Sequence, residues 1–370
     1  MATYKEKLLV GICEKLQLTP GRYKLADERY QTIADTIQAD PVFRNIKLEV
    51  YPHGSFRLKT TVKPLLKNEY DLDFVVEIPR NLKMTPMELY NHVYRILSSD
   101  GVHNGMVEKK TRCIRVNYAN DFHMDIMPGQ VYNSVTREII VPDCDLKYWY
   151  HHSNPIGYAN WFEEQAKTQI INEMRQFMSL QERTEPIADQ EMVKRLEPLR
   201  RAVQLIKRYR DIYCDRTKAE PVRSIVLCTL MGHISSSYSS DLDIIRDFCS
   251  YVLSLSAGAH SRPFLVKNPV VDEVLTEKWE ENRNNYVDFI RMMSSLDKDV
   301  NKLIKTGNNT EIATLLRKMF GESITTTVIK EQAEIITNAR ELGALSVGPT
   351  GLLNTDNVGA LVKKNTFYGK

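Results

Sequence analysis

The stretch YDLDFVVEI, at residues 70–78, constrains the fold more than any other part of the sequence. Apolar residues occupy every second position, and they are Leu72, Phe74, Val76 and Ile78. This spacing predicts a β-strand, on which successive side chains point to opposite faces. Asp71 and Asp73 therefore project together from the other face, where two carboxylates repel each other unless a cation lies between them. An isolated pair of this kind is most often part of a solvated edge strand.

Patterns on either side of this strand indicate mixed α/β structure up to about residue 160. The expected strands are at residues 45–51, 70–78, 112–118 and 122–127. The first of them runs directly into His53-Gly54-Ser55. Two helices, broken at Pro20-Gly21, are expected in the first forty residues, and another between residues 85 and 98.

The second half of the chain has helical periodicity. The segments that show it are residues 199–213, 224–234, 285–296 and 313–320. The last thirty residues are rich in Gly and Asn and show little period. We therefore expect an α+β chain with a mixed sheet and flanking helices at residues 1–160, a helical domain at 161–340 and an irregular tail at 341–370.

The composition is that of an ordinary soluble globular protein, with 42% hydrophobic and 26% charged residues among 370. The net charge of +3 argues against a protein that coats nucleic acid, so no strong nucleic-acid binding is expected. The six cysteines lack the spacing of metal ligands, which favours reduced thiols in the cytosol. The longest apolar run, at 224–234, is shorter than the roughly 20 residues of a membrane span. We expect a cytoplasmic protein without a membrane segment.

Two further features give the aspartate pair a chemical interpretation. A Gly54-Ser55 turn follows the preceding strand, and a third aspartate, Asp125, lies among apolar neighbours in FHMDIMPG. Three carboxylates on adjacent strands can hold two Mg²⁺ or Mn²⁺ ions about 4 Å apart, which stabilise the attacking hydroxyl and the leaving pyrophosphate of a phosphoryl displacement. Glycine lets backbone N–H groups approach phosphate oxygens, and the serine hydroxyl adds a donor. The pattern predicts a metal-bound triphosphate beside Asp71, Asp73 and Asp125.

A second Asp-x-Asp, at Asp241 and Asp243, provides a comparison within the chain. No Gly-Ser turn precedes it, and apolar residues follow it with helical spacing. Ser240 or Asp241 suits the N-cap of a helix. We interpret this pair as a helix start and not as a metal site.

The segments GSFRLKTTVKP, EYDLDFVVEI and FHMDIMPG together resemble the polymerase-β-type nucleotidyltransferases. The chain is still more similar to the bacterial cGAS/DncV-like nucleotidyltransferases (CD-NTases) of the anti-phage CBASS systems, because later stretches agree as well. Those stretches are NPIGYANWF, AVQLIKRYRDIY, SIVLCTL, VKNPVVDE and TFYG. The resemblance implies a polymerase-β-like core packed against a C-terminal helical domain. Fifteen residues separate Ser55 from Asp71, a longer spacing than in many polymerase-β relatives.

The resemblance also implies roles for the residues of the motifs. Asp71 and Asp73 would bind both metal ions. Asp125 would help to bind the catalytic ion and favour deprotonation of the attacking ribose hydroxyl. Gly54 and Ser55 would contact the donor triphosphate.

Lys207 and Ser224 stand at the positions of a lysine and a serine with which the family holds the triphosphate. Without the resemblance, Lys207 would be one of several basic residues on a solvated helix face, and Ser224 would cap a helix. Arg57, Lys59 and Thr61 follow the turn closely enough to reach phosphates, although a surface role is an equal alternative.

The histidines are interpreted as structural. His53 precedes the turn and His123 lies on a predicted strand, so either could act as a base, but metal-activated hydroxyls need little further base. His151 and His152 have no cysteine partners nearby. A zinc-binding insertion like that of the animal DNA sensor is therefore not expected.

The function implied by the resemblance is the joining of ribonucleoside triphosphates into a cyclic di- or trinucleotide second messenger, with release of pyrophosphate, in anti-phage defence. ATP is expected among the substrates. The expected partners are a product-binding effector protein and, as for some members, regulatory proteins encoded nearby. Two alternatives stay open: a transferase acting on an RNA, protein or small-molecule acceptor, and an inactive nucleotide-binding sensor. Some members have their C-terminal glycine conjugated to a target; here Lys370 follows Gly369, so this property is not carried over and a flexible tail is expected.

Overall fold

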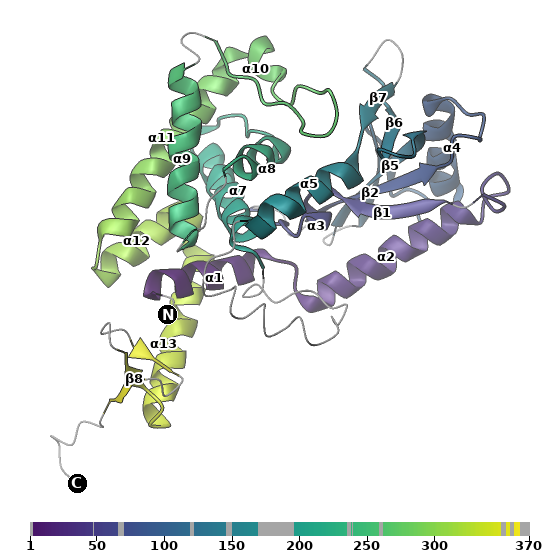
Figure 1. Cartoon of the computed structure of the whole chain (residues 1–370). Coiled ribbons are helices and arrows are strands. Elements are labelled where there is room, and N and C mark those ends of the chain that lie inside the picture. The colour runs from purple at the N-terminus through teal and green to yellow at the C-terminus, as the bar shows by residue number, and fades with distance from the viewer. Residues whose placement is uncertain are drawn as a thin grey trace.

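The computed structural model describes most of the chain. The described residues are 3–46, 48–65, 70–118, 122–145, 150–168, 196–234, 238, 240–258, 262–348, 353–355 and 359–362. Within them the chain forms a sheet-based half and a helical half that lie side by side (Figure 1).

A seven-stranded mixed sheet forms the N-terminal half. Its strands are β1 (Glu49–His53), β2 (Tyr70–Ile78), β3 (Val107–Lys109), β4 (Ile114–Tyr118), β5 (Phe122–Asn133), β6 (Glu138–Pro142) and β7 (Tyr150–Ser153). The central path runs in the order β1-β2-β5-β4-β3, and β6 pairs with β5 and β7. β2 and β5 are parallel neighbours, whereas the other pairs are antiparallel.

One face of this sheet is covered by α2 (Pro20–Gln38) and α4 (Pro86–Ser99). The alternating apolar residues of β2 are buried against these helices. Thr19 caps α2 and Pro20 is its first residue, so the break between the first two helices lies before Pro20. Thr85 and Glu88 form a capping box at the start of α4. Because the apolar face is used in this way, the face with the aspartates is left for the helical half.

The sequence predicted the central strands better than the outer ones. β2 has the predicted bounds, and the strands expected at 112–118 and 122–127 are confirmed as β4 and β5, the latter extending to Asn133. β1 begins later than expected, at Glu49. β3, β6 and β7 were not predicted, since short strands owe their conformation to their neighbours rather than to a local pattern.

The helical half consists mainly of helices from the second part of the chain. The helices are α1 (Tyr4–Leu16), α5 (Pro155–Thr168), α7 (Pro198–Thr217), α8 (Ser224–Gly232), α9 (Asp241–Gly258), α10 (Lys278–Glu281), α11 (Arg283–Lys305), α12 (Asn309–Phe320) and α13 (Glu322–Glu341). Its core includes Leu9 and Ile12 of α1 and Phe162 of α5. The first helix therefore packs with the helical half, although the sequence had placed it in the sheet unit at 1–160. An apolar stripe shows that a helix is buried but not which neighbour buries it.

The Asp241-Asp243 pair lies at the start of α9, as predicted. The Ser240 hydroxyl accepts a hydrogen bond from the Asp243 backbone N–H at 3.1 Å, which caps the helix. The Asp241 carboxylate instead forms a buried bidentate pair with Arg201 of α7.

The segment after α13 forms a small sheet rather than a wholly irregular tail. β8 (Ser346–Val347) pairs with β9 (Leu353–Asn354) and with β10 (Ala360–Leu361). The expectation of an irregular segment is thus wrong for these residues, because two-residue strands are too short to show a period. The motif TFYG and the pair Gly369-Lys370 lie outside the described residues. None of the described helices combines the length and the apolar character that crossing a bilayer requires.

Candidate active site

Four side chains form a row across adjacent strands on the sheet face opposite to α2 and α4. The register aligns His53 of β1 with Asp73 of β2, Asp73 with Asp125 of β5, and Asp125 with Arg115 of β4. Residues aligned on neighbouring strands project from the same face. Asp71, two residues before Asp73, lies on this face as well. The strand pairing thus brings the three predicted aspartates together.

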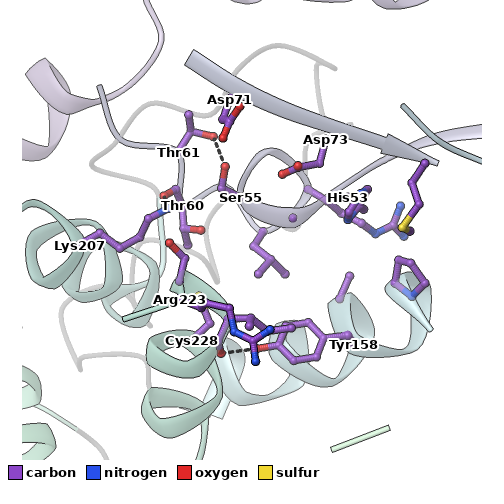
Figure 2. A pocket seen from close by; sticks show the side chains of 18 of the residues that line it. His53, Ser55, Thr60, Thr61, Asp71, Asp73, Tyr158, Lys207, Arg223 and Cys228 are labelled. Atoms are coloured by element: carbon purple, nitrogen blue, oxygen red, sulfur yellow. Dashed lines mark hydrogen bonds between the residues drawn. The ribbon is translucent and has the colours of Figure 1, made fainter. Parts of the chain in front are cut away.

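The turn after β1 is a single helical turn, α3 (Gly54–Arg57), and its first residue requires glycine. Gly54 has a φ of +57°, which L side chains rarely adopt. A Cβ atom here would lie 2.3 Å from Asp73 Oδ2. The glycine therefore allows the turn to lie directly against the Asp73 carboxylate. Figure 2 shows the next residue, Ser55, pointing toward Thr61, and the two hydroxyl oxygens are 3.5 Å apart.

Arg115 is the counter-ion of two of the aspartates. Its Nε donates to Asp125 Oδ1 at 2.7 Å and its Nη2 donates to Asp125 Oδ2 at 2.8 Å, which is a bidentate pair. The same Nη2 lies 3.3 Å from Asp71 Oδ1. Across the described ranges, no three His, Cys, Asp or Glu side chains are arranged to ligate one ion as they stand. At the row, Arg115 occupies both oxygens of Asp125.

Burial and neighbouring carboxylates raise the pKa of two of the aspartates, Asp73 and Asp71. Burial, followed by the charges of Asp71 and Asp125, raises the pKa of Asp73 to about 7. Burial and Asp125 also raise the pKa of Asp71, although 64% of its side chain is exposed. Arg115 and Lys207 oppose both shifts. Carboxylates that are costly to ionise together suit a hard divalent cation, so this donor set fits Mg²⁺ or Mn²⁺.

The row borders a cavity of about 870 Å³ between the sheet and the helical half. The predicted site residues in its wall are Gly54, Ser55, Arg57, Thr61, Asp71, Asp73, Lys207 and Ser224. This volume lies toward the upper end of the range for small-molecule sites. Two predicted residues do not line the cavity: Asp125, which Arg115 holds, and Lys59, which is exposed.

One face of α7 donates hydrogen bonds to the loop that follows the turn. The pairs are Arg200 with the Leu58 carbonyl, Lys207 with Thr60, Gln204 with Thr61 and Arg208 with Lys63. Lys207 Nζ donates to the backbone carbonyl oxygen of Thr60 at 2.9 Å, and Figure 2 shows the lysine side chain reaching toward Thr60 from the helical side. Only 6% of Lys207 is exposed and burial lowers its pKa, so it does not belong to a solvated basic face. The helical half thereby positions the loop that carries Thr61.

Ser224 lies at the first position of α8 and not at its cap. Its hydroxyl oxygen accepts a hydrogen bond from Arg210 Nη1 at 2.9 Å, and it faces the cavity. The alternative of a simple helix cap therefore does not apply. Arg210 is itself paired with Asp211.

Sequence reasoning missed a group of polar residues in the wall. They are Arg112, Arg115, His151, Arg210, Asp211, Arg223, Asn268 and Glu273. Arg115 could have been predicted, because it alternates with apolar Ile114 and Val116 on a predicted strand and therefore projects from the opposite face. Most of the others come from turns and loops, where no period indicates the direction of a side chain. His53 also lies in the wall, and burial lowers its pKa to about 4, which leaves it neutral near pH 7.

The chain is similar to known proteins over nearly its whole length. Residues 5–166 match the model of the Second Messenger Oligonucleotide or Dinucleotide Synthetase domain. The c-di-GMP synthase of Roseivirga ehrenbergii is 31% identical over 374 residues, which cover 99% of this chain and 98% of the relative. The cyclic dinucleotide synthase CdnG of Bradyrhizobium diazoefficiens is 25% identical over 348 residues, which cover 88% of this chain and 82% of the relative.

The fold is similar to solved structures as well. The structure of the Bradyrhizobium diazoefficiens CD-NTase CdnG in complex with GTP matches with a TM-score of 0.72 at 23% identity, covering 89% of this chain and 99% of that one. At this identity the match supports the fold alone. It confirms the predicted mixed sheet with flanking helices and a helical C-terminal part.

Proposed function

We propose, because this chain belongs to the bacterial cGAS/DncV-like nucleotidyltransferases, that it joins two GTP molecules into a cyclic dinucleotide. Nucleotidyl transfer and cyclic dinucleotide synthesis follow from the family membership. The choice of GTP is supported by the c-di-GMP synthase and by CdnG, which was solved with GTP. ATP, the substrate that the sequence analysis favoured, becomes the comparison substrate.

The observation that carries the proposal is the position of the aspartate row. Asp73 lies against Gly54, and Asp71 and Asp73 border a cavity whose other wall is formed by the helical half. Ser55, Thr61 and Lys207 lie in the same wall, and hydroxyl and ammonium donors of this kind bind triphosphate oxygens.

The chemistry is a phosphoryl displacement that occurs twice. A ribose hydroxyl oxygen of one nucleotide bonds to the α-phosphorus of the other, and the bond from that phosphorus to the leaving pyrophosphate breaks. Asp71, Asp73 and Asp125 would hold two Mg²⁺ or Mn²⁺ ions, which would supply positive charge to stabilise the attacking and the leaving oxygens. Asp125 favours loss of the hydroxyl proton. The second displacement, with the roles of the two nucleotides exchanged, closes the ring.

The place of the reaction in the cell is also part of the proposal. We expect a cytoplasmic enzyme whose cyclic product activates an effector protein in anti-phage defence, with regulatory proteins encoded nearby. Family membership supports these expectations.

The test is a synthesis assay with labelled nucleotides. Purified protein is incubated with labelled GTP, ATP, or all four nucleotides and Mg²⁺ or Mn²⁺, and then treated with phosphatase. We expect a phosphatase-resistant product from GTP alone, whose mass equals that of a cyclic dinucleotide. A product that stays linear, or that forms only when an acceptor is supplied, would favour the transferase alternative.

Two variants control this assay. The double variant D71A/D73A should give no resistant product, because it loses the carboxylates that face the cavity. D243A, in the second Asp-x-Asp at the start of α9, should keep the activity, because Asp243 pairs with Arg246 outside the cavity wall. Loss of product in both variants would show that the assay reports folding rather than catalysis.

A further inference from the structure

A second polar cluster lines the same cavity and shares no residue with the aspartate row. Its members are Arg112, His151, Asn268 and Glu273. Arg112 precedes β4 and His151 belongs to β7, whereas Asn268 and Glu273 come from the loop between α9 and α10. The sheet and the helical half therefore meet at this cluster. The phosphate contacts proposed above do not use any of these side chains.

Glu273 is the centre of the cluster. Its Oε1 accepts a hydrogen bond from His151 Nε2 at 3.1 Å and lies 4.0 Å from Arg112 Nη1. Its Oε2 accepts from Asn268 Nδ2 at 2.9 Å. Burial raises the pKa of Glu273, but the hydrogen bonds from His151 and Asn268 outweigh it, so the pKa lies below its ordinary value. The side chain is 18% exposed, and the carboxylate is thus a fixed, ionised acceptor at the cavity wall.

The loop that carries Glu273 is held by its own backbone. The Asn268 N–H donates to the Glu273 carbonyl at 2.8 Å, and Lys267 forms a bridge with Val274. An ionised carboxylate has about four lone-pair sites, of which His151 and Asn268 use two. Acceptor capacity therefore remains on a carboxylate that lines the cavity.

The other carboxylates of the wall have different partners. Among the described residues, the acidic side chains that line the cavity are Asp71, Asp73, Asp211 and Glu273. Asp71 and Asp73 belong to the row, and Asp211 is paired with Arg210 at 2.6 Å. Glu273 is therefore the acidic group best placed to contact a part of the substrate other than the reacting phosphates.

We infer that Glu273 recognises the guanine base of a bound GTP. Guanine presents two adjacent donors, the N1–H and the 2-amino group, and a carboxylate accepts from both. Adenine presents a lone pair at N1 and no 2-amino group, so the same carboxylate would repel it. Arg112 donates to Asp143 through its Nε and lies 4.0 Å from Glu273 through its Nη1, and arginine is a common donor to guanine O6 and N7. This inference rests on the proposed function, because it assigns the base contact of that reaction.

Binding measurements without turnover test the inference. Non-hydrolysable analogues of GTP, ITP and ATP are titrated into the intact protein with Mg²⁺ by calorimetry. ITP has the guanine ring without the 2-amino group, so it isolates one hydrogen bond. We expect the wild-type protein to bind the GTP analogue about 10- to 100-fold more tightly than the ITP analogue, the usual effect of one hydrogen bond to a charged group.

Two glutamates of the same segment give a matched pair of variants. E273Q should reduce the ratio of GTP to ITP affinity to about threefold or less, because the amide presents a donor where guanine also has donors. E277Q should keep the wild-type ratio, since Glu277 is 44% exposed, pairs with Arg223 and does not line the cavity. E273D, which retains a carboxylate, should restore part of the preference.

The ratio of the affinities for the GTP and ITP analogues distinguishes base recognition by Glu273 from a structural role. If Glu273 only joined the two halves through His151, E273Q would weaken all three analogues equally and leave the ratio unchanged, which would overturn the inference. Equal binding of the GTP and ITP analogues by the wild-type protein would overturn it as well. A cyclic product formed under either result would leave the proposed function intact, whereas a wild-type protein that binds no analogue would overturn both. Thermal unfolding of each variant confirms that the protein is folded.

Discussion

Among single residues, Asp73 links the stability of the protein to pH. The pKa of its carboxyl group is about 7 in the folded protein, above the ordinary value of 3.8 that applies to the unfolded chain. The folded protein therefore binds more protons between these values, and without metal its stability falls as the pH rises from about 4 to about 7. The D73N variant has no carboxyl group to ionise and therefore lacks this loss of stability. At pH 8 in a chelator we expect its Tm to exceed that of the wild type by about 2 °C or more.

The control for this prediction is the same comparison at pH 4, where the wild-type carboxyl is mostly protonated and the two proteins should agree. Addition of Mg²⁺ at pH 8 should raise the Tm of the wild type more than that of D73N. Equal Tm values in the chelator at pH 8 would contradict the raised pKa.

Arg115 is the second residue whose effect can be isolated. It holds both oxygens of Asp125 and reaches Asp71, so a metal ion competes with its guanidinium for the same carboxylates. We expect R115M to lower the Tm of the metal-free protein, because the aspartates lose their counter-ion. The same variant should bind Mn²⁺ about 3- to 10-fold more tightly, as measured by electron paramagnetic resonance of free Mn²⁺.

R137M is the matched control for R115M. Arg137 also pairs with two carboxylates of the sheet, Glu49 and Glu77, but it does not line the cavity. Its removal should leave the Mn²⁺ affinity unchanged. An unchanged affinity in R115M would show that Arg115 does not compete with metal.

Among the elements, α7 determines how the helical half holds the loop at residues 58–63. Arg200 is 2% exposed, pairs with Glu197 and Glu163, and donates to the Leu58 carbonyl. We expect R200L to destabilise the protein by about 3 kcal/mol, because it leaves buried acceptors without a partner. Thermal unfolding should show a fall of several degrees. R216L, at the exposed end of the same helix, should change the Tm little.

The elements also show how far the sequence could predict the molecule. The period of β2 was enough to predict its bounds and the shared face of Asp71 and Asp73. The pattern also predicted that Asp125 lies on a strand adjacent to the Asp71-Asp73 pair, but the parallel register of β2 with β5, which aligns Asp73 with Asp125, depends on the tertiary fold and was not predicted. The turn at Gly54 was predicted from residue type, and its close approach to Asp73 explains why glycine is needed.

The residues that were missed share a physical reason. Glu273 and Asn268 lie in a loop, where side-chain direction depends on local backbone hydrogen bonds that no periodic pattern reveals. Without the family resemblance, Lys207 would have been interpreted as part of a solvated basic helix face, but it is buried together with Arg200 and Arg208. Composition alone could not show this, because buried and solvated arginines look the same in a sequence until their acceptors are known.

At the scale of the whole molecule, helices that line the cavity lie apart from the C-terminal sheet: Figure 1 shows α5, α7 and α8 well above β8, which lies beside α13. The cavity lies between the sheet and α5, α7 and α8, whereas β8 to β10 lie beside α13. α13 is fixed from its other end: Val328 lies against Gly11 of α1, and Lys15 pairs with Glu331 at 2.5 Å. Truncation after Leu342 should therefore leave α13 and the cavity in place.

We expect this truncated protein to synthesise its cyclic product at about the wild-type rate, because none of the removed residues that the structure describes lines the cavity. Its Tm should fall by about 2 to 4 °C, since Leu345 and Ser346 are buried in the wild type and their packing is lost. Truncation after Phe320 removes α13 and the side chain of Val328 from the helical core, and it should destabilise the protein much more. A loss of synthesis with an unchanged Tm after the shorter truncation would contradict the separation of the two regions, because it would mean that the C-terminal segment takes part in the reaction.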